Sequence, residues 1–363
     1  MGRVILISGQ GGAGSTTLAA QTAEAARDEG FTVTEVDASG SEVGHGVASE
    51  LPHVLGATLG ALLLEAGADS ILPEEWEALP TVSMITQWQR ITDARRDGDV
   101  IVVDAGPLAR LREFVQVPGV LLRLLDAALT PRMAMWRSTN GEGGVFDELS
   151  DARLTVLSWI AVLEAADTSV RVVSRPERAS VDVVMRACAA LSLLGLRIDG
   201  IVVSRFPRRK ESWPAGVRRE AERTLADLAK RSQGIAVWRS TSRRRPVPNG
   251  RSAVDPFPES GRAWALRENE VSVEASADGS QKPSKASFLM HLPMREPARS
   301  EVRVGVQGAR LVAAFDGVVR WIGLPPVLQR CVAQEAERTD QGITVHWSPN
   351  ADVWPATSGD EAS

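Results

Sequence analysis

A glycine-rich stretch near the N-terminus has the residues best suited to chemistry in this sequence. Residues 9–17 read GQGGAGSTT, directly after a short apolar run and before a helix-compatible stretch. Glycines let successive backbone N–H groups point at a phosphate, a helix N-terminus favours negative charge, and a Ser or Thr hydroxyl can hold Mg²⁺. The stretch therefore predicts a phosphate-binding loop made of Gly9, Gln10, Gly11, Gly12, Ala13, Gly14, Ser15, Thr16 and Thr17.

The loop lacks the cations that normally neutralise a bound triphosphate. A common phosphate loop has lysine where this chain has Ser15. The glycine spacing resembles the deviant loop of the ArsA (arsenite-pump) and tail-anchored-protein-targeting ATPases, which carry a further lysine at the position of Gln10. A charge-assisted hydrogen bond contributes about 1.5–3 kcal/mol, so losing two weakens nucleotide binding by roughly 10²–10⁴-fold. We expect ATP with Mg²⁺ to bind weakly or not at all.

Two alternatives stay open for this loop. Another cation could replace the lysines and leave a working ATPase. The stretch could also be an ordinary glycine-rich turn between a strand and a helix.

Two aspartates extend the resemblance. Asp37, in TEVDASGSEVG, matches the first switch of the family, which contains the residue that orients the attacking water. Asp104, in VIVVDAGPLARLREFVQVPGVL, matches the metal-associated aspartate of the second switch. The resemblance therefore implies catalytic roles for Asp37 and Asp104, and a Mg²⁺ site at Thr16 and Asp104 if nucleotide binds.

Several other chemical groups of the family are replaced in this chain. Leu108 and Ala109 replace the Thr-Gly of the second switch, and Ser204 replaces an asparagine that recognises the adenine in the family. We therefore predict a pseudo-ATPase that acts as a binding or regulatory partner, with ATP hydrolysis lost or very weak.

The resemblance also implies partners. Family members pair across the nucleotide face, so we expect a homodimer, or a heterodimer in which an intact paralogue supplies the lysine. Clients of the family are apolar helices, including the tails of tail-anchored proteins. Leu- and Ala-rich segments at 54–68 and 120–137 are candidates for such a groove, although core packing explains them as well.

A basic segment supports a rival function. Residues 205–245 contain 13 Lys/Arg and 4 Asp/Glu, a charge of about +9. Related partitioning proteins bind DNA or anionic membranes through such basic patches. Charged helix faces are usually only solvated, so nucleic acid is not the partner we expect, and peripheral membrane contact is an alternative.

The pattern of strands and helices expected around these residues indicates an α/β fold. Short apolar, β-branched runs at 4–8, 32–37, 100–104, 169–174, 200–205 and 235–238 are separated by helix-compatible stretches, which predicts a mostly parallel sheet covered on both faces. We assign residues 1–240 to this P-loop domain and 241–287, rich in Pro, Ser and charge, to a flexible linker.

The C-terminal part predicts a small β-sandwich. Residues 288–350 alternate apolar and polar side chains between Gly, Asp and Pro turns, and resemble the α-crystallin-like module of some ArsA relatives. We expect residues 351–363 to be disordered. No leader or membrane span is evident and Cys188 and Cys331 are the only cysteines, so we expect a soluble cytoplasmic protein without a disulfide framework or a cysteine zinc site.

Overall fold

A computed structural model gives the fold in two parts, a parallel α/β body and a C-terminal β-domain. It describes residues 2–40, 80–129, 143–206, 214–240, 254–255, 271–275, 287–295, 302–339 and 342–354. The predicted client segment 54–68 lies outside these residues, as does the part of 120–137 beyond residue 129.

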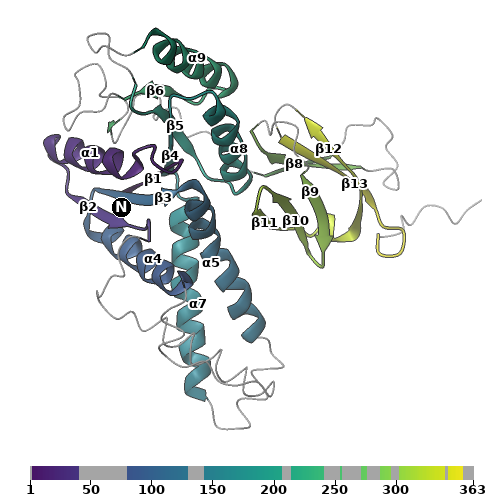
Figure 1. The fold of residues 1–363 in the computed structure, drawn as a ribbon. Helices are drawn as coiled ribbons and strands as arrows, with labels where there is room; N and C mark the ends of the chain where they lie inside the picture. The colour runs from purple at the N-terminus through teal and green to yellow at the C-terminus, as the bar shows by residue number, and fades with distance from the viewer. Residues whose placement is uncertain are drawn as a thin grey trace, which may run out of the picture.

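The body is built on a six-stranded parallel sheet with the order β2-β3-β1-β4-β5-β6 (Figure 1). The strands are β1 (Arg3–Gly9), β2 (Val33–Asp37), β3 (Val100–Pro107), β4 (Thr168–Ser174), β5 (Ile198–Val203) and β6 (Val237–Arg239). All six predicted strands are present. The prediction of a mostly parallel sheet is therefore confirmed.

Helices cover both faces of the sheet. On one face lies α1 (Ser15–Asp28), which packs on alternate residues of the central strands such as Ile5 and Ile7. The other face carries α4 (Pro80–Asp97), α5 (Leu108–Ala128), α7 (Gly143–Glu164), α8 (Ala179–Leu193) and α9 (Ala215–Arg231), which share a core with Val4 and Leu6. Because successive strand residues point to opposite faces, a strand covered on both sides must be apolar throughout. This explains the uninterrupted apolar runs in the sequence.

The C-terminal β-domain consists of two antiparallel sheets. One has the order β11-β10-β9 and the other β12-β13-β8-β7. The strands are β7 (Ser272–Ala275), β8 (Phe288–Pro293), β9 (Arg303–Gln307), β10 (Arg310–Phe315), β11 (Val318–Gly323), β12 (Cys331–Thr339) and β13 (Gly342–Pro349). Buried residues of both sheets, including Leu311 and Trp347, form one core. The domain is therefore a small β-sandwich, as predicted; its likeness to α-crystallin stays a prediction.

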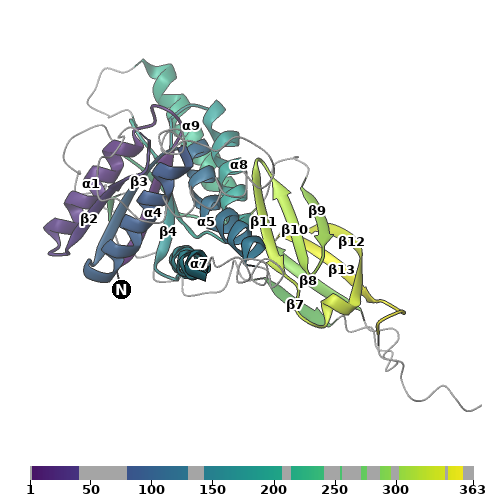
Figure 2. The same ribbon diagram turned by 90° about the horizontal axis from the view of Figure 1, so that it is seen from below.

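The β-domain packs directly on α5 and α8 of the body. Figures 1 and 2 place it beside these helices and away from α1 and β2. Ala189, Ala190 and Leu193 of α8 belong to the hydrophobic core of the β-domain. Since both parts share buried side chains, the β-domain is a fixed component of the fold.

Polar contacts complete this docking. Arg112 of α5 donates to the carbonyl oxygen of Asp316 at 2.7 Å and also bonds its carboxylate, in the turn between β10 and β11. Gln116 accepts a hydrogen bond from the Val319 amide at 2.9 Å, and Arg320 donates to the Leu193 carbonyl at 3.0 Å. These contacts hold one hairpin of the β-domain against two helices of the body.

Two described pieces of the predicted linker are ordered parts of the fold. Residues 272–275 form β7, which pairs with β8, so they belong to the β-domain. Val254 is buried against the α1 face of the sheet, and the carbonyl oxygen of Asp255 accepts a hydrogen bond from Arg171 at 2.9 Å. The prediction of a flexible linker over 241–287 is wrong for these pieces, because a four-residue strand is too short to show a sequence period.

The start of the predicted disordered tail is also ordered. Residues 351–354 form a turn, in which the Trp354 amide donates to the Asn350 carbonyl at 2.8 Å. The Trp354 ring lies 5.9 Å from that of Phe288. Residues 355–363 lie outside the described part of the chain.

Candidate functional site

The predicted site residues meet at the carboxyl edge of the parallel sheet. The glycine-rich loop follows β1, Asp37 ends β2, Asp104 lies near the end of β3, and Ser204 follows β5. In an open parallel sheet this edge is where ligands bind, because the loops after the strands and the N-termini of the following helices converge there. The topology thus brings residues that are distant in sequence to one edge.

The loop has the backbone geometry of an anion cradle. Gly12 and Gly14 have positive φ values of 72° and 91°, a region open to glycine and strained for other residues. Within the described part of the chain, no hydrogen-bond partner is found for the amides of Gly11, Gly12, Gly14, Ser15, Thr16 and Thr17. A Cβ atom built on Gly11 or Gly14 meets no atom of the described residues within 4 Å, so these residues leave room at the loop.

The helix after the loop adds to the attraction for an anion. α1 is 14 residues long and has no acidic residue in its first turn. The unpaired N–H groups and the aligned peptide dipoles of such a helix carry about half a positive charge at its N-terminus. Backbone geometry therefore fits phosphate, whereas the glycine-rich loop and α1 contain no lysine.

Asp37 and Asp104 lie side by side, as expected for the two switches. They are register partners on the neighbouring strands β2 and β3. Asp37 Oδ1 accepts a hydrogen bond from the Ser39 amide at 2.8 Å, and Asp104 Oδ1 accepts one from the Gly106 amide at 3.0 Å. A carboxylate can accept about four hydrogen bonds, so the single bond from the Gly106 amide does not by itself use up the acceptor capacity of Asp104.

Thr16 and Thr17 lie at the exposed start of α1, and Asp104 is 8% exposed. Within the described residues, no group of three or more His, Cys, Asp or Glu side chains could hold a metal ion by itself. A Mg²⁺ ion at Thr16 and Asp104 would therefore need phosphate and water oxygens as further ligands, which is how Mg²⁺ usually binds.

A buried amide lies behind the first switch. Gln87 of α4 donates from Nε2 to the Asp37 carbonyl at 3.0 Å. Its Oε1 atom is buried and has no hydrogen-bond partner among the described residues. A buried acceptor without a partner is costly, so this amide marks a position where a ligand or a water molecule would be stabilising.

The two switch segments contact each other at glycine. Gly106 has a positive φ of 64°, and a Cβ atom at this position would lie 2.9 Å from Cα of Ser39. Leu108, which replaces the threonine of the family pattern, is 6% exposed and packs in the main core. The start of α5 is therefore anchored by apolar packing, where the family has a hydroxyl and a hinge.

Ser204 supports the loop. Its hydroxyl donates to the carbonyl oxygen of Ala13 and lies 3.3 Å from that of Ser174. The side chain is 8% exposed. Ser204 thus connects β5 to the glycine-rich loop, a role that the sequence reading did not anticipate.

Arg175 is a functional candidate that the sequence reading missed. It follows β4, whose end lies beside the end of β1, and its guanidinium donates to the Gly11 carbonyl of the loop. A Cβ atom on Gly12 would come within 2.8 Å of Arg175 Nη2. Its backbone amide also donates to Gln10 Oε1, at 3.4 Å. Only the adjacency of β1 and β4 could have revealed this cation.

A second arginine lies at the other side of the edge. Arg110, in the first turn of α5, donates to Ser83 Oγ at 3.1 Å, and its Nη2 atom lies 3.7 Å from the position of a Cβ atom on Gly40. Its Nε atom is buried and lacks a hydrogen-bond partner among the described residues. Arg110 and Arg175 are therefore two cations that the described part of the chain brings to this edge.

Sheet order, loop geometry and the paired aspartates define a P-loop-type α/β protein. A sequence profile of the anion-transporting ATPase family, ArsA ATPase, matches residues 24–224, and the chain belongs to this family. ATPases of the ArsA type generally bind ATP with Mg²⁺. The match begins after the glycine-rich loop, in the middle of α1.

Two relatives match across both domains. The uncharacterized protein SCO2128 of Streptomyces coelicolor is 25% identical over 398 aligned positions, covering 97% of this chain and 99% of the relative. Protein Rv2184c of Mycobacterium tuberculosis is 24% identical over 412 positions, covering 97% of each chain. Among the described residues, no helix is long and apolar enough to cross a membrane.

Proposed function

We propose that this protein is a nucleotide-impaired member of the ArsA family that acts as a binding or regulatory partner. One observation carries the proposal: six backbone amides of the loop have no hydrogen-bond partner among the described residues, while the lysine positions of the loop are Ser15 and Gln10. Phosphoryl transfer depends on positioning and on neutralising developing charge, so hydrolysis suffers more than binding. Thr16 and Asp104 would hold Mg²⁺, and Asp37 would orient water, if nucleotide binds.

Calorimetric titration with Mg·ATP tests this proposal. The natural protein is expected to bind weakly or not at all, and Ser15→Lys to bind about 10–100-fold more tightly, because it restores one charge-assisted hydrogen bond. Ala20→Lys is the matched control, since Ala20 is an exposed residue of the same helix and adds the same charge away from the loop. Micromolar binding with turnover by the natural protein would overturn the pseudo-ATPase. Equal, absent binding by all three proteins would show that the loop is only a turn.

Arg175 supports a second candidate, a working ATPase with a substitute cation. The guanidinium already contacts the loop at Gly11 and Gly12. Under this candidate, Arg175→Ala lowers Mg·ATP affinity at least tenfold and abolishes turnover. Arg178 is an exposed arginine three residues further on, and the control variant Arg178→Ala is expected to change neither the affinity nor the turnover. Under the pseudo-ATPase proposal, Arg175→Ala leaves the weak binding of the natural protein within about threefold.

Exposed apolar side chains on α5 and α7 support a client of the apolar helical type. Val120 and Leu124 of α5 are 43% and 54% exposed, and Leu154 of α7 is 62% exposed. Leu124→Asp and Leu154→Asp are expected to weaken binding of an apolar helical peptide at least tenfold, because a charge replaces the contact. Val183→Asp on α8, 48% exposed in the natural protein, is the control. Unchanged binding in the α5 and α7 variants would remove this client surface.

The dimer and the basic segment are also proposals. A homodimer, or a heterodimer with an intact paralogue, predicts a sedimentation change on mixing the two chains.

For the basic-segment rival, α9 interleaves Arg218 and Arg219 with Glu220 and Glu222, a pattern typical of a solvated face. Retention by DNA or anionic vesicles that is lost with added salt would favour the rival instead.

A further inference from the structure

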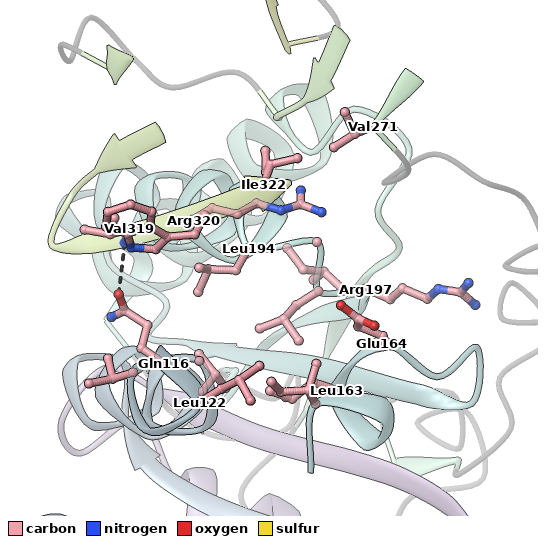
Figure 3. Close-up of a pocket in the computed structure, with 18 of the residues that line it drawn as sticks. Gln116, Leu122, Leu163, Glu164, Leu194, Arg197, Val271, Val319, Arg320 and Ile322 are labelled. Atoms are coloured by element: carbon pink, nitrogen blue, oxygen red, sulfur yellow. Dashed lines mark hydrogen bonds between the residues drawn. The ribbon is translucent and has the colours of Figure 1, made fainter. Parts of the chain in front are cut away.

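A large pocket lies between the body and the β-domain, at the opposite end of the sheet from the glycine-rich loop. Its volume is about 1150 Å³, slightly above the range of about 300–1,000 Å³ that is usual for ligand sites. It is lined by α5, the end of α7, the connections before β5 and β6, and β11 (Figure 3). Because these connections precede their strands, the pocket is at the amino edge and is separate from the candidate nucleotide site.

Part of the lining is apolar and only half-buried. In Figure 3, Leu122 and Leu163 lie on one side of the space and Leu194 on the other. The pocket is also lined by Val120 and Val319, which are 43% and 39% exposed. Removing apolar surface from water is favourable by about 25 cal/mol per Å², so an apolar chain lying here would be stabilised.

The remainder of the lining is positively charged. Five arginines and three acids line the pocket, a difference of two charges, and they are Arg123, Arg197, Arg295, Arg310 and Arg320 with Asp126, Glu164 and Asp199. Asp199 is fully buried and bonded to Arg171 at 2.7 Å. Asp126 is 2.7 Å from Arg153 and 3.8 Å from Arg310. Two of the three acids are therefore already paired.

Arg123 is the cation best placed to meet an anion. It donates to the Gly119 carbonyl of its own helix at 3.0 Å and lies 4.9 Å from the centre of the Trp321 ring. No carboxylate pairs with it in the described part of the chain. Burial lowers the pKa of Arg123, and the nearby positive charge of Arg310 lowers it further. Two like charges held close together attract an anion that binds both.

We propose that this pocket binds a single-chain anionic amphiphile, of the long-chain fatty acid type. The carboxylate would meet Arg123 and Arg310, and the chain would lie along Leu122, Leu163 and Leu194. An uncharged apolar helix would leave the arginine excess without compensation, which is why the charge favours an anionic ligand.

Displacement of fluorescent cis-parinaric acid by palmitate tests the proposal on the full-length chain. We expect saturable binding of one molecule per chain. Arg123→Gln is expected to weaken palmitate binding at least tenfold, because a charge-assisted hydrogen bond is lost. Arg219→Gln is the matched control: Arg219 is an exposed arginine of α9 that also donates to the carbonyl four residues earlier, at 3.3 Å.

Two further measurements distinguish the contribution of the ligand's negative charge from that of its hydrocarbon tail. Hexadecanol, which has the chain but no negative charge, is expected to compete at least tenfold less well than palmitate. Leu163→Trp fills the space with a larger side chain and is expected to abolish palmitate binding. If that variant does not fold, the Arg123→Gln variant tests the proposal, and circular dichroism checks that Arg123→Gln is folded. Absent saturable binding, unchanged affinity in Arg123→Gln, or equal competition by hexadecanol would each overturn the proposal.

Discussion

The carboxyl edge of the sheet and the contact between the two domains differ in whether their polar groups have hydrogen-bond partners. At the edge, six loop amides and the Gln87 side-chain oxygen have no partner among the described residues. At the domain contact, Arg112, Gln116 and Arg320 each bond to a group of the other domain. Unpaired groups are costly unless a ligand meets them, whereas matched groups stabilise the fold. The loop amides are therefore arranged to receive an anion, whereas the contacts of Arg112, Gln116 and Arg320 hold the β10–β11 hairpin in place.

Thiol reactivity is expected to give the largest contrast between the two regions. Cys188 of α8 is fully buried, and burial raises its pKa from 9.0 to about 12. At pH 8 the reactive thiolate is then about a thousandfold scarcer than for an ordinary thiol, and the labelling rate rises with pH up to that pKa. A cysteine placed at the exposed Thr17, at the start of α1, should instead label quickly, because the helix dipole lowers its pKa.

Alkylation followed by peptide mass spectrometry measures both rates. Cys331 serves as an internal reference, since it is half-buried and its pKa is raised by burial to a smaller extent. Labelling of Cys188 as fast as that of Thr17→Cys would show that α8 is not held between the sheet and the β-domain.

Truncation in the shared core is expected to have the next largest effect. Leu193 is fully buried between α8 and the β-domain, so Leu193→Ala should lower the free energy of unfolding by about 2–5 kcal/mol. Val183→Ala, on the exposed face of the same helix, should change it by less than about 0.5 kcal/mol. Urea unfolding checks both values. Independent unfolding of the β-domain in the natural protein would contradict a shared core.

Loss of the ion pair between the domains is expected to cost less. Arg112 and Asp316 are 26% and 21% exposed in their side chains, so Arg112→Ala should destabilise the protein by about 1–2 kcal/mol. Asp316→Asn should act in the same direction while keeping the left-handed turn, where Asp316 has a φ of 48°. Arg96→Ala, which removes an exposed pair with Asp93, is the control and should cost less than about 0.5 kcal/mol. Equal losses in both pairs would show that the domain contact is no stronger than an exposed pair.

The smallest effect is expected at the loop itself. Thr16 is exposed and its hydroxyl has no partner in the described residues, so Thr16→Ala should change the free energy of unfolding by less than about 0.5 kcal/mol. The same thermal or urea measurement applies. A loss above 1 kcal/mol would mean that the loop is part of the structural framework and would weaken the contrast with the domain contact.

The sequence predicts the framework of the fold and of the site, because burial on both faces leaves a direct pattern. Ile5, Ile7 and their neighbours must be apolar, and glycine is favoured where φ is positive, at Gly12 and Gly14. These constraints are local, so they can be recognised without coordinates. Asp37 and Asp104 were identified through their resemblance to the two switches of the ArsA family, and the structure makes them register partners on β2 and β3.

The remaining parts depend on adjacency that the sequence does not show. Arg175 reaches the loop only because β4 is the neighbour of β1. Arg112 and Gln116 resemble the polar residues of any exposed helix face, yet they bind the β10–β11 turn. Ser204 looked like a degraded adenine reader and is a support for the loop. Polar side chains have no period that identifies their partners, whereas apolar ones do.

The position of α5 has a mechanical consequence. The helix begins at Leu108, a few residues after Asp104, and Arg112 lies about 6 Å further along at 1.5 Å per residue. A stiff helix transmits a displacement at one end to everything attached along it. A rearrangement at Asp104 would therefore displace the hairpin that Arg112 holds, so the orientation of the β-domain would report on the state of the carboxyl edge of the sheet.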